Sequence, residues 1–151
     1  MKIDSSLMFE PVKVKTMAPQ IEAAGFDGAY TFEGQSDPFI SIAAAAMTTQ
    51  KMELMTSIAV AFARNPMSLA YLGNDLQNLS NGRFILGLGA QIKPHIERRF
   101  SMPWSKPASR MREMVQAIRA IWDCWENGEK LNFEGEFYNH TLMTPMFVPP
   151  T

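Results

Sequence analysis

Apolar and polar positions along the first ninety residues alternate between a helical and a strand period. The clearest stretch runs from Asn65 to Gln91. A helix is predicted there because leucines recur three or four positions apart: Leu69, Leu72, Leu76 and Leu79. Asn65 and Pro66 predict its start, since the asparagine side chain can accept a hydrogen bond from a first-turn amide and proline lacks the N–H that would stay unpaired there. Asn81 and Gly82 can take the positive φ that ends a helix.

A strand follows this helix directly. Residues 84–88 are nearly all apolar, which is typical of a parallel strand covered on both faces. Gly87 and Gly89 lie at its carboxyl end, where α/β folds bind their ligands. A bare backbone at these positions would let a phosphate or a ring come close.

The residues before Asn65 repeat the same alternation of strand and helix. Strands are predicted at 3–7, 29–32 and 52–60, and helices at 14–24 and 38–47. Asp37 and Pro38 repeat the cap-and-proline start. The order βαβαβαβ with short connections predicts a parallel α/β sheet with right-handed crossovers.

The pattern changes after Gln91. Residues 92–107 mix basic, aromatic and proline positions without a steady period, and an amphipathic helix is predicted at 108–125, ended by Asn127 and Gly128. A small hairpin is predicted from strands at 131–133 and 136–138 around Glu134 and Gly135. The tail from 143 to 151 has three prolines and no predicted element.

Composition narrows the class of protein. With 151 residues, 46% of them hydrophobic and 19% charged, we expect one globular domain over residues 1–151. A net charge of −1 gives no attraction to nucleic acid or a membrane surface. Charged residues near the start leave no signal-peptide core, and the longest apolar run, near 40–47, is too short to span a bilayer, so we expect a cytoplasmic protein. A single cysteine, Cys124, excludes an internal disulfide and suits packing.

The number of units limits the fold. A complete eight-fold βα barrel typically needs about 250 residues. Four βα units therefore form either an open sheet or the N-terminal half of a barrel.

The whole chain resembles the luciferase-like monooxygenase superfamily, and especially its deazaflavin-dependent branch. The resemblance is carried by five segments in order, Ala23–Asp27, Thr56–Ile58, Arg64–Pro66, Leu79–Gly89 and Pro107–Arg110. It implies an α/β fold of the (β/α)8 TIM-barrel type with flavin or deazaflavin across its carboxyl face. The chain would then provide about the first four βα units and a small hairpin insertion.

The resemblance also implies cofactor-binding residues. Ser57 and Ile58 match a bulge at the end of the third strand, where family members carry a non-proline cis peptide behind the ring. An ordinary buried strand is the alternative from the residues alone. Gly89, Ala90 and Gln91 match the loop after the fourth strand, whose backbone amides contact the cofactor linker and phosphate. A plain turn is the alternative there.

One basic residue is a further cofactor-binding candidate. Arg110 could offer charge to a phosphate or to the polyglutamate tail of a deazaflavin. Solvated basic residues are the alternative at this position.

Two residues are catalytic candidates. Glu33 matches an acidic position at the end of the second strand in the sugar-phosphate dehydrogenases of the family, and Gly34 stands where those members have a catalytic histidine. This departure argues against sugar-phosphate oxidation. His95, in the loop after the fourth strand, could act as an acid or base near neutral pH. A solvated carboxylate and a surface histidine are the alternatives, and two histidines without a ligand cluster predict no metal.

Two functions stay open from the sequence. The first is hydride transfer with deazaflavin coenzyme F-420, or monooxygenation with flavin mononucleotide (FMN), on a small organic substrate. Phe9, Phe32 and Phe62 would line the pocket or belong to the core. The second is a non-catalytic half-barrel that forms a homodimer, or a piece of a longer enzyme that lacks its C-terminal half.

Overall fold

The computed structural model describes residues 1–8 and 10–150. Phe9, a predicted pocket residue, lies outside this range. The chain divides into two compact units, and the division falls within one helix. The first unit comprises residues 1–59 and 75–89, and the second comprises residues 60–74 and 90–151. The prediction of one domain over residues 1–151 stays a prediction.

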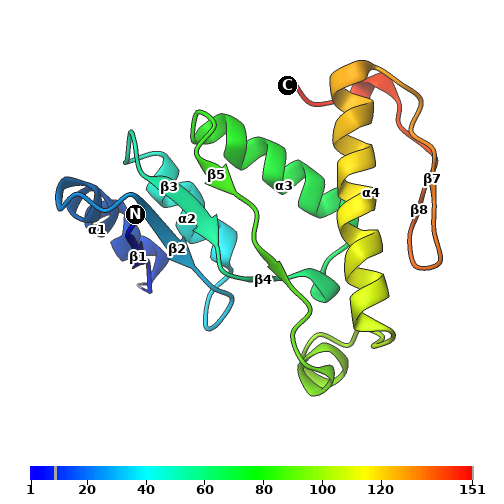
Figure 1. Cartoon of the computed structure of the whole chain (residues 1–151), viewed down its shortest axis with the longest axis horizontal. Coiled ribbons are helices and arrows are strands. Elements are labelled where there is room, and N and C mark those ends of the chain that lie inside the picture. Colours follow the sequence, from blue (N-terminus) through cyan, green and yellow to red (C-terminus); the bar gives the residue numbers. More distant parts are fainter. Residues whose placement is uncertain (9, 151) are drawn as a thin grey trace. The chain divides into compact units, whose positions relative to one another are not determined.

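The first unit contains a four-stranded parallel sheet (Figure 1). Its strands, in their order across the sheet, are β1 (Asp4–Ser6), β2 (Gly28–Thr31), β3 (Glu53–Thr56) and β5 (Phe84–Ile85). The helices between them are α1 (Pro11–Ala23), α2 (Pro38–Ala46) and α3 (Pro66–Leu79). The predicted parallel βαβαβαβ order is confirmed.

The two faces of the sheet differ in burial. One row of paired residues, Ala29, Leu54 and Phe84, is buried, and α1 and α2 pack on that face (Figure 1). The next row, Tyr30, Met55 and Ile85, points the opposite way because side chains alternate along a strand. Ile85 is 46% exposed. The expectation that the fourth strand is covered on both faces is therefore wrong for the described residues.

Local capping sets the helix ends as predicted. The Ser68 N–H donates to Asn65 Oδ1 over 2.8 Å at the start of α3. The Phe39 N–H donates to Asp37 Oδ1 over 2.9 Å at the start of α2. Asn81 and Gly82 have φ values of 55° and 80° after α3. Of the predicted leucine stripe, Leu69 and Leu76 are buried and Leu79 is exposed.

Two predicted strands are each divided in the structure. The segment 52–60 forms β3 and then β4 (Ala59–Val60), and the segment 84–88 forms β5 and then β6 (Leu88–Gly89). β4 pairs with β6 in a separate two-stranded sheet. Both interruptions come at the carboxyl end of the main sheet.

Two charged side chains hold the opposite, amino-terminal edge of the first unit. The Glu22 carboxylate accepts hydrogen bonds from the backbone N–H groups of Gln50, Lys51 and Met52, the shortest over 2.7 Å. The Arg83 guanidinium donates to four carbonyls and one hydroxyl. The carbonyls are those of Ala46, Thr49, Met52 and Ser80, and the hydroxyl is that of Thr49. These bonds fix the turn that leads into β3.

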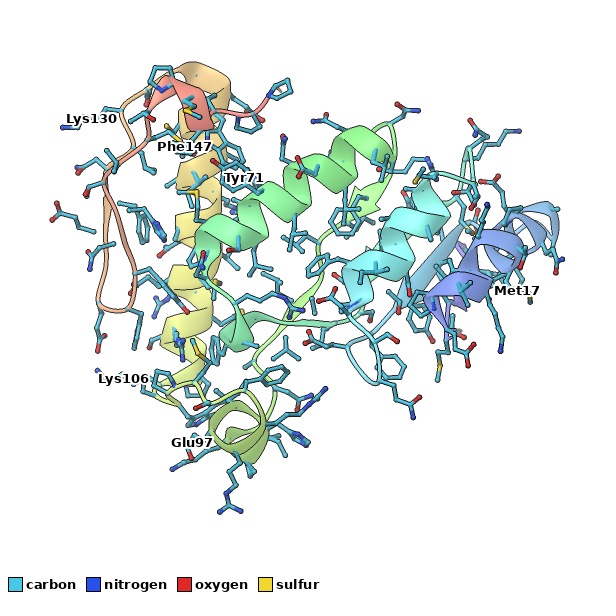
Figure 2. The ribbon with its side chains drawn as sticks, turned by 180° about the vertical axis from the view of Figure 1, so that it is seen from behind. Met17, Tyr71, Glu97, Lys106, Lys130 and Phe147 are labelled. Atoms are coloured by element: carbon cyan, nitrogen blue, oxygen red, sulfur yellow. The ribbon has the colours of Figure 1, made fainter. Side chains whose placement is uncertain are left out.

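The second unit is built on α4 (Pro107–Asn127), with Gly128 at φ 68° after its end. The shorter elements are Ala61–Ala63 and Pro145–Phe147, both 3₁₀ helices, and the π-helix His95–Arg99. The Tyr71 hydroxyl donates to the Phe147 carbonyl, which joins the C-terminal segment to α3 (Figure 2). No helix in the described part of the chain combines the length and apolar character needed to cross a bilayer.

The hairpin is present but displaced from its predicted position. β7 (Phe133–Glu134) pairs antiparallel with β8 (Asn139–His140). Residues 136–138, predicted as a strand, form the turn instead, because their backbone N–H groups donate to the Glu113 carboxylate over 2.6–3.0 Å. An amide engaged by a side chain is not available to a strand ladder.

The Glu22 contacts predict a pH-dependent contribution to stability. Partial burial raises the pKa of the Glu22 carboxyl. The N–H groups of Lys51, Met52 and Gln50 and the charge of Arg83 outweigh burial and hold the pKa below its ordinary value of 4.5. Glu22→Gln should lower the free energy of unfolding by about 1–3 kcal/mol at pH 7. The stabilisation is present above the unfolded pKa and is lost as pH falls through the folded one.

Urea unfolding at pH 7 and pH 3 measures this difference. The gap between wild type and Glu22→Gln should narrow at the lower pH. Glu126→Gln, on the exposed end of α4, is the matched control and should change little at either pH. An equal gap at both pH values would contradict the assigned role of the carboxylate.

Candidate functional site

Two hydrogen bonds join Thr56, at the end of β3, to Gly87, which follows β5. The Thr56 hydroxyl donates to the Gly87 carbonyl over 2.8 Å, and the Gly87 N–H donates to the Thr56 Oγ1 over 2.9 Å. A Cβ atom added to Gly87 would overlap the backbone carbonyl of Thr56. Only glycine permits this approach, which interrupts both strands at the same level.

Four of the predicted site residues lie together just beyond this junction. The Ser57–Ile58 peptide bond is cis, as the family resemblance implied. The Ser57 N–H donates to the Thr31 carbonyl over 2.7 Å, and the Glu33 N–H donates to the Ile58 carbonyl over 3.1 Å. A Cβ added to Gly89 would lie 2.7 Å from Ile58 Cγ1. The ends of β2, β3 and β6 therefore bring Glu33, Ser57, Ile58 and Gly89 into one cluster.

The two glycines have a different role from the one expected. The sequence suggested that Gly87 and Gly89 leave room for a ligand. In the structure, Thr56 and Ile58 of the chain itself occupy the space beside them. The glycines shape the strand ends and thereby place Ile58, which is half-buried.

Ala90 and Gln91 continue the chain from this cluster and belong to the second unit. Gln91 has φ 62°, and its side-chain Oε1 accepts a hydrogen bond from the Ile92 N–H over 3.1 Å. Within the described residues, the backbone N–H groups of Ala90 and Gln91 make no hydrogen bond. Two consecutive free amides, the second at a residue with left-handed φ, are available to donate to an anion.

His95 begins the π-helix of the second unit and is exposed. In the same segment Lys93 lies 3.8 Å from Glu97, and the Arg99 guanidinium carbon lies 4.8 Å from the centre of the Phe100 ring. Figure 2 shows Glu97 on this helix. The catalytic assignments of His95 and Glu33 stay predictions.

Arg110 is buried within the second unit, with 6% of its surface exposed. Its Nη1 donates to the Pro103 carbonyl over 2.6 Å, and its Nε donates to the Tyr138 hydroxyl over 2.9 Å. The guanidinium also lies 4.4 Å from the centre of the Phe62 ring, which contacts Trp104 edge to face. These contacts give Arg110 a packing role, and Phe62 is a core residue. Cofactor binding by Arg110 stays a prediction.

The sequence reasoning missed Glu113. Its carboxylate accepts the three hydrogen bonds of the hairpin turn, and a Cβ added to Gly135 would overlap that carboxylate. Burial raises the pKa of the neighbouring Tyr138 hydroxyl, although the hydrogen bond from Arg110 opposes the shift. The spacing of Arg110 and Glu113, one helical turn apart, was the available signal, since both face the same hairpin.

A cavity of about 620 Å³ lies at the carboxyl ends of β1 and β2 in the first unit. Leu7 and Met8 line it from β1, Thr31 and Phe32 from β2, and Ser41 from α2. Of the three predicted pocket phenylalanines, Phe32 is thus placed at a cavity. No group of three or more metal-ligating side chains occurs among the described residues.

The luciferase-like monooxygenase family matches residues 5–151. An uncharacterized protein of Mycobacterium tuberculosis is 56% identical over 149 residues, which is 99% of this chain and 44% of that protein. The chain belongs to the luciferase-like monooxygenase family. A putative coenzyme F-420-dependent oxidoreductase of the same organism is 36% identical over 102 residues, or 67% of this chain and 29% of that protein.

Solved structures of luciferase-like proteins share the fold. The monooxygenase RslO1 from Streptomyces bottropensis has a TM-score of 0.80 at 25% identity, covering 93% of this chain and 47% of its own. The oxygenating constituent of 3,6-diketocamphane monooxygenase from Pseudomonas putida, solved with FMN, has a TM-score of 0.79 at 20% identity, covering 95% and 45%. The luciferase-like chain spans about half the length of these relatives, and its parallel sheet corresponds to about four βα units of their TIM-barrel fold.

The contacts of Arg110 predict a structural effect that is separable from cofactor binding. Arg110→Lys keeps the charge but loses the planar fork, so it should lower the free energy of unfolding by about 1–3 kcal/mol, as measured by urea unfolding. Arg112→Lys, at an exposed position on the same helix, is the control and should be near neutral. Unchanged stability in Arg110→Lys together with weaker cofactor binding would favour the cofactor role instead.

Proposed function

We propose that this chain supplies part of the cofactor face of a flavin- or deazaflavin-dependent oxidoreductase that acts on a small organic substrate. The observation that carries the proposal is the cluster of Glu33, Ser57, Ile58 and Gly89 at the carboxyl ends of parallel strands, where α/β folds bind ligands. The structural relative from Pseudomonas putida was solved with FMN. The mycobacterial relative at 36% identity is described as dependent on coenzyme F-420.

The residues present fit such a cofactor in two respects. The half-buried Ile58 side chain, held by Gly89, offers an apolar contact for a flat ring. In the second unit, taken by itself, the N–H groups of Ala90 and Gln91, free within the described residues, can donate to a phosphate or linker oxygen. A bound flavin or deazaflavin supplies the hydride-transfer or oxygen chemistry, and the protein binds and orients the reactants.

Three side chains have distinct roles in this proposal. Ile58 supports the ring from one side, which leaves the other side for the substrate. Glu33, whose N–H is fixed by the Ile58 carbonyl, offers a carboxylate next to the ring position. His95, which belongs to the second unit, is a separate candidate acid or base, and its role rests on the family resemblance and its exposed position.

Fluorescence titration of the 151-residue chain with FMN and, separately, with coenzyme F-420 tests the proposal. We expect saturable binding of one of the two. Gly89→Ala should weaken binding because its new Cβ displaces Ile58, while Glu126→Gln should bind as wild type does.

Far-ultraviolet circular dichroism of both variants separates lost binding from lost folding. If neither cofactor binds a folded chain, the cofactor proposal fails for this chain.

A second candidate function is self-assembly. It is supported by the open face of the sheet, where Tyr30, Met55 and Ile85 lack the helical cover of the other face. Among the described residues, β1 and β5 also have one hydrogen-bonded neighbour each, so both sheet edges can pair further.

Light scattering measures the mass in solution. A homodimer of twice the 17.0 kDa chain is expected if self-assembly covers this face, and Ile85→Lys should shift it to a monomer. Ile3→Lys, at an exposed position beside the β1 edge, tests whether the edge or the face carries the contact. A wild-type monomer at all concentrations contradicts this candidate.

A further inference from the structure

The cavity of about 620 Å³ in the first unit has the size of a small-molecule site, since such sites commonly span roughly 300–1,000 Å³. It lies at the carboxyl ends of β1 and β2 and is bordered by the start of α1, by α2 and by the loop after β2. The prediction of pocket residues from sequence found only Phe32 of its described lining.

One part of the lining is apolar. Leu7 is buried at the end of β1, and Met8 and Phe32 are exposed by 63% and 43%. Exposed large apolar side chains at a cavity favour binding of an apolar group, because binding removes their apolar surface from water. These three side chains therefore suit the apolar body of a ligand.

Two largely buried residues each bring a hydroxyl group to the polar part of the lining. Thr31 is 6% exposed and Ser41 is 2% exposed, and both line the cavity. Neither side-chain hydroxyl makes a hydrogen bond within the described residues, and neither oxygen is an enclosed atom without a partner, so both are accessible from the cavity. A hydroxyl can both donate and accept, so each of the two can bind an oxygen atom of a ligand.

The charges beside the cavity neutralise each other. Lys13 Nζ lies 3.2 Å from Glu10 Oε2, and both residues contribute to the lining. The remaining polar lining, from the loop after β2, is uncharged: Gln35 and Ser36. A charged ligand would lose hydration here without gaining a free counter-charge.

We propose that this cavity binds an uncharged carbonyl or hydroxyl compound with an apolar body, its oxygen at Thr31 and Ser41 and its body against Leu7, Met8 and Phe32. The inference rests on the proposed function in one respect, namely that the bound compound would be the substrate class of the oxidoreductase. Binding itself needs no cofactor, so it can be measured separately.

Three probes with the same phenyl body test the proposal: acetophenone, ethylbenzene and benzoate. Methyl-labelled methionine gives the readout by nuclear magnetic resonance, because Met8 lines the cavity and Met47, at the end of α2, does not. The Met8 signal is assigned with Met8→Leu. We expect acetophenone to shift the Met8 methyl resonance saturably, with little change at Met47, and ethylbenzene and benzoate to bind more weakly.

Hydroxyl removal makes the test specific. Thr31→Val and Ser41→Ala should each weaken acetophenone binding about 3- to 10-fold, the effect of one hydrogen bond, and leave ethylbenzene binding unchanged. Thr16→Val is the matched control, since the Thr16 hydroxyl already donates to the Lys13 carbonyl over 3.0 Å and Thr16 does not line the cavity.

The outcomes separate this inference from the proposed function. Equal binding of acetophenone and ethylbenzene, or preferred binding of benzoate, overturns the inference even where FMN or coenzyme F-420 binds. Selective acetophenone binding that falls in Thr31→Val and Ser41→Ala supports the cavity assignment. This result supports the cavity assignment whether or not a cofactor binds. If neither FMN nor coenzyme F-420 binds, only the proposed function is overturned.

Discussion

The close approach of Gly87 to Thr56 determines the geometry at the carboxyl end of the sheet. Reciprocal hydrogen bonds between the Thr56 hydroxyl and the Gly87 backbone draw β5 against β3, and the missing Cβ makes room for the Thr56 carbonyl. Both strands are interrupted at this level, so the peptide groups beyond it are no longer part of the main ladder. Ser57, Ile58 and Gly89, the residues predicted to contact a cofactor, lie together just beyond this level.

The two edges of the sheet differ in the contacts that hold them. At the amino-terminal edge, the Glu22 carboxylate accepts hydrogen bonds from backbone N–H groups of the turn before β3. The Arg83 guanidinium donates to backbone carbonyls of the same turn. At the carboxyl edge, backbone hydrogen bonds from Ser57 to Thr31 and from Glu33 to Ile58 hold together the residues predicted to contact a cofactor. In βα barrels, the active sites lie at the carboxyl ends of the strands.

Sequence reasoning predicted what depends on neighbouring residues. Asn65 capped its helix through an amide three residues away, and the parallel order followed from the alternation of periods. It missed Glu22 and Glu113, whose partners lie more than twenty residues away in the chain, because no local pattern encodes such contacts. The hairpin strands lie one to three residues later than predicted for the same reason. The Ser57–Ile58 cis peptide was predicted through family resemblance alone.

Thr31 contributes to the cavity lining and also contacts the cluster of predicted site residues. Its carbonyl accepts the Ser57 N–H over 2.7 Å, while its hydroxyl belongs to the cavity lining. A ligand oxygen at that hydroxyl would therefore contact the same residue that binds the Ser57–Ile58 peptide. The end of β2 therefore contacts the predicted ring-binding peptide and also forms part of the cavity wall. A substitution at Thr31 reports on the hydroxyl group alone only when the hydrogen bond from the Ser57 N–H is preserved. Thr31→Val meets that condition because valine has the same backbone and a similar shape.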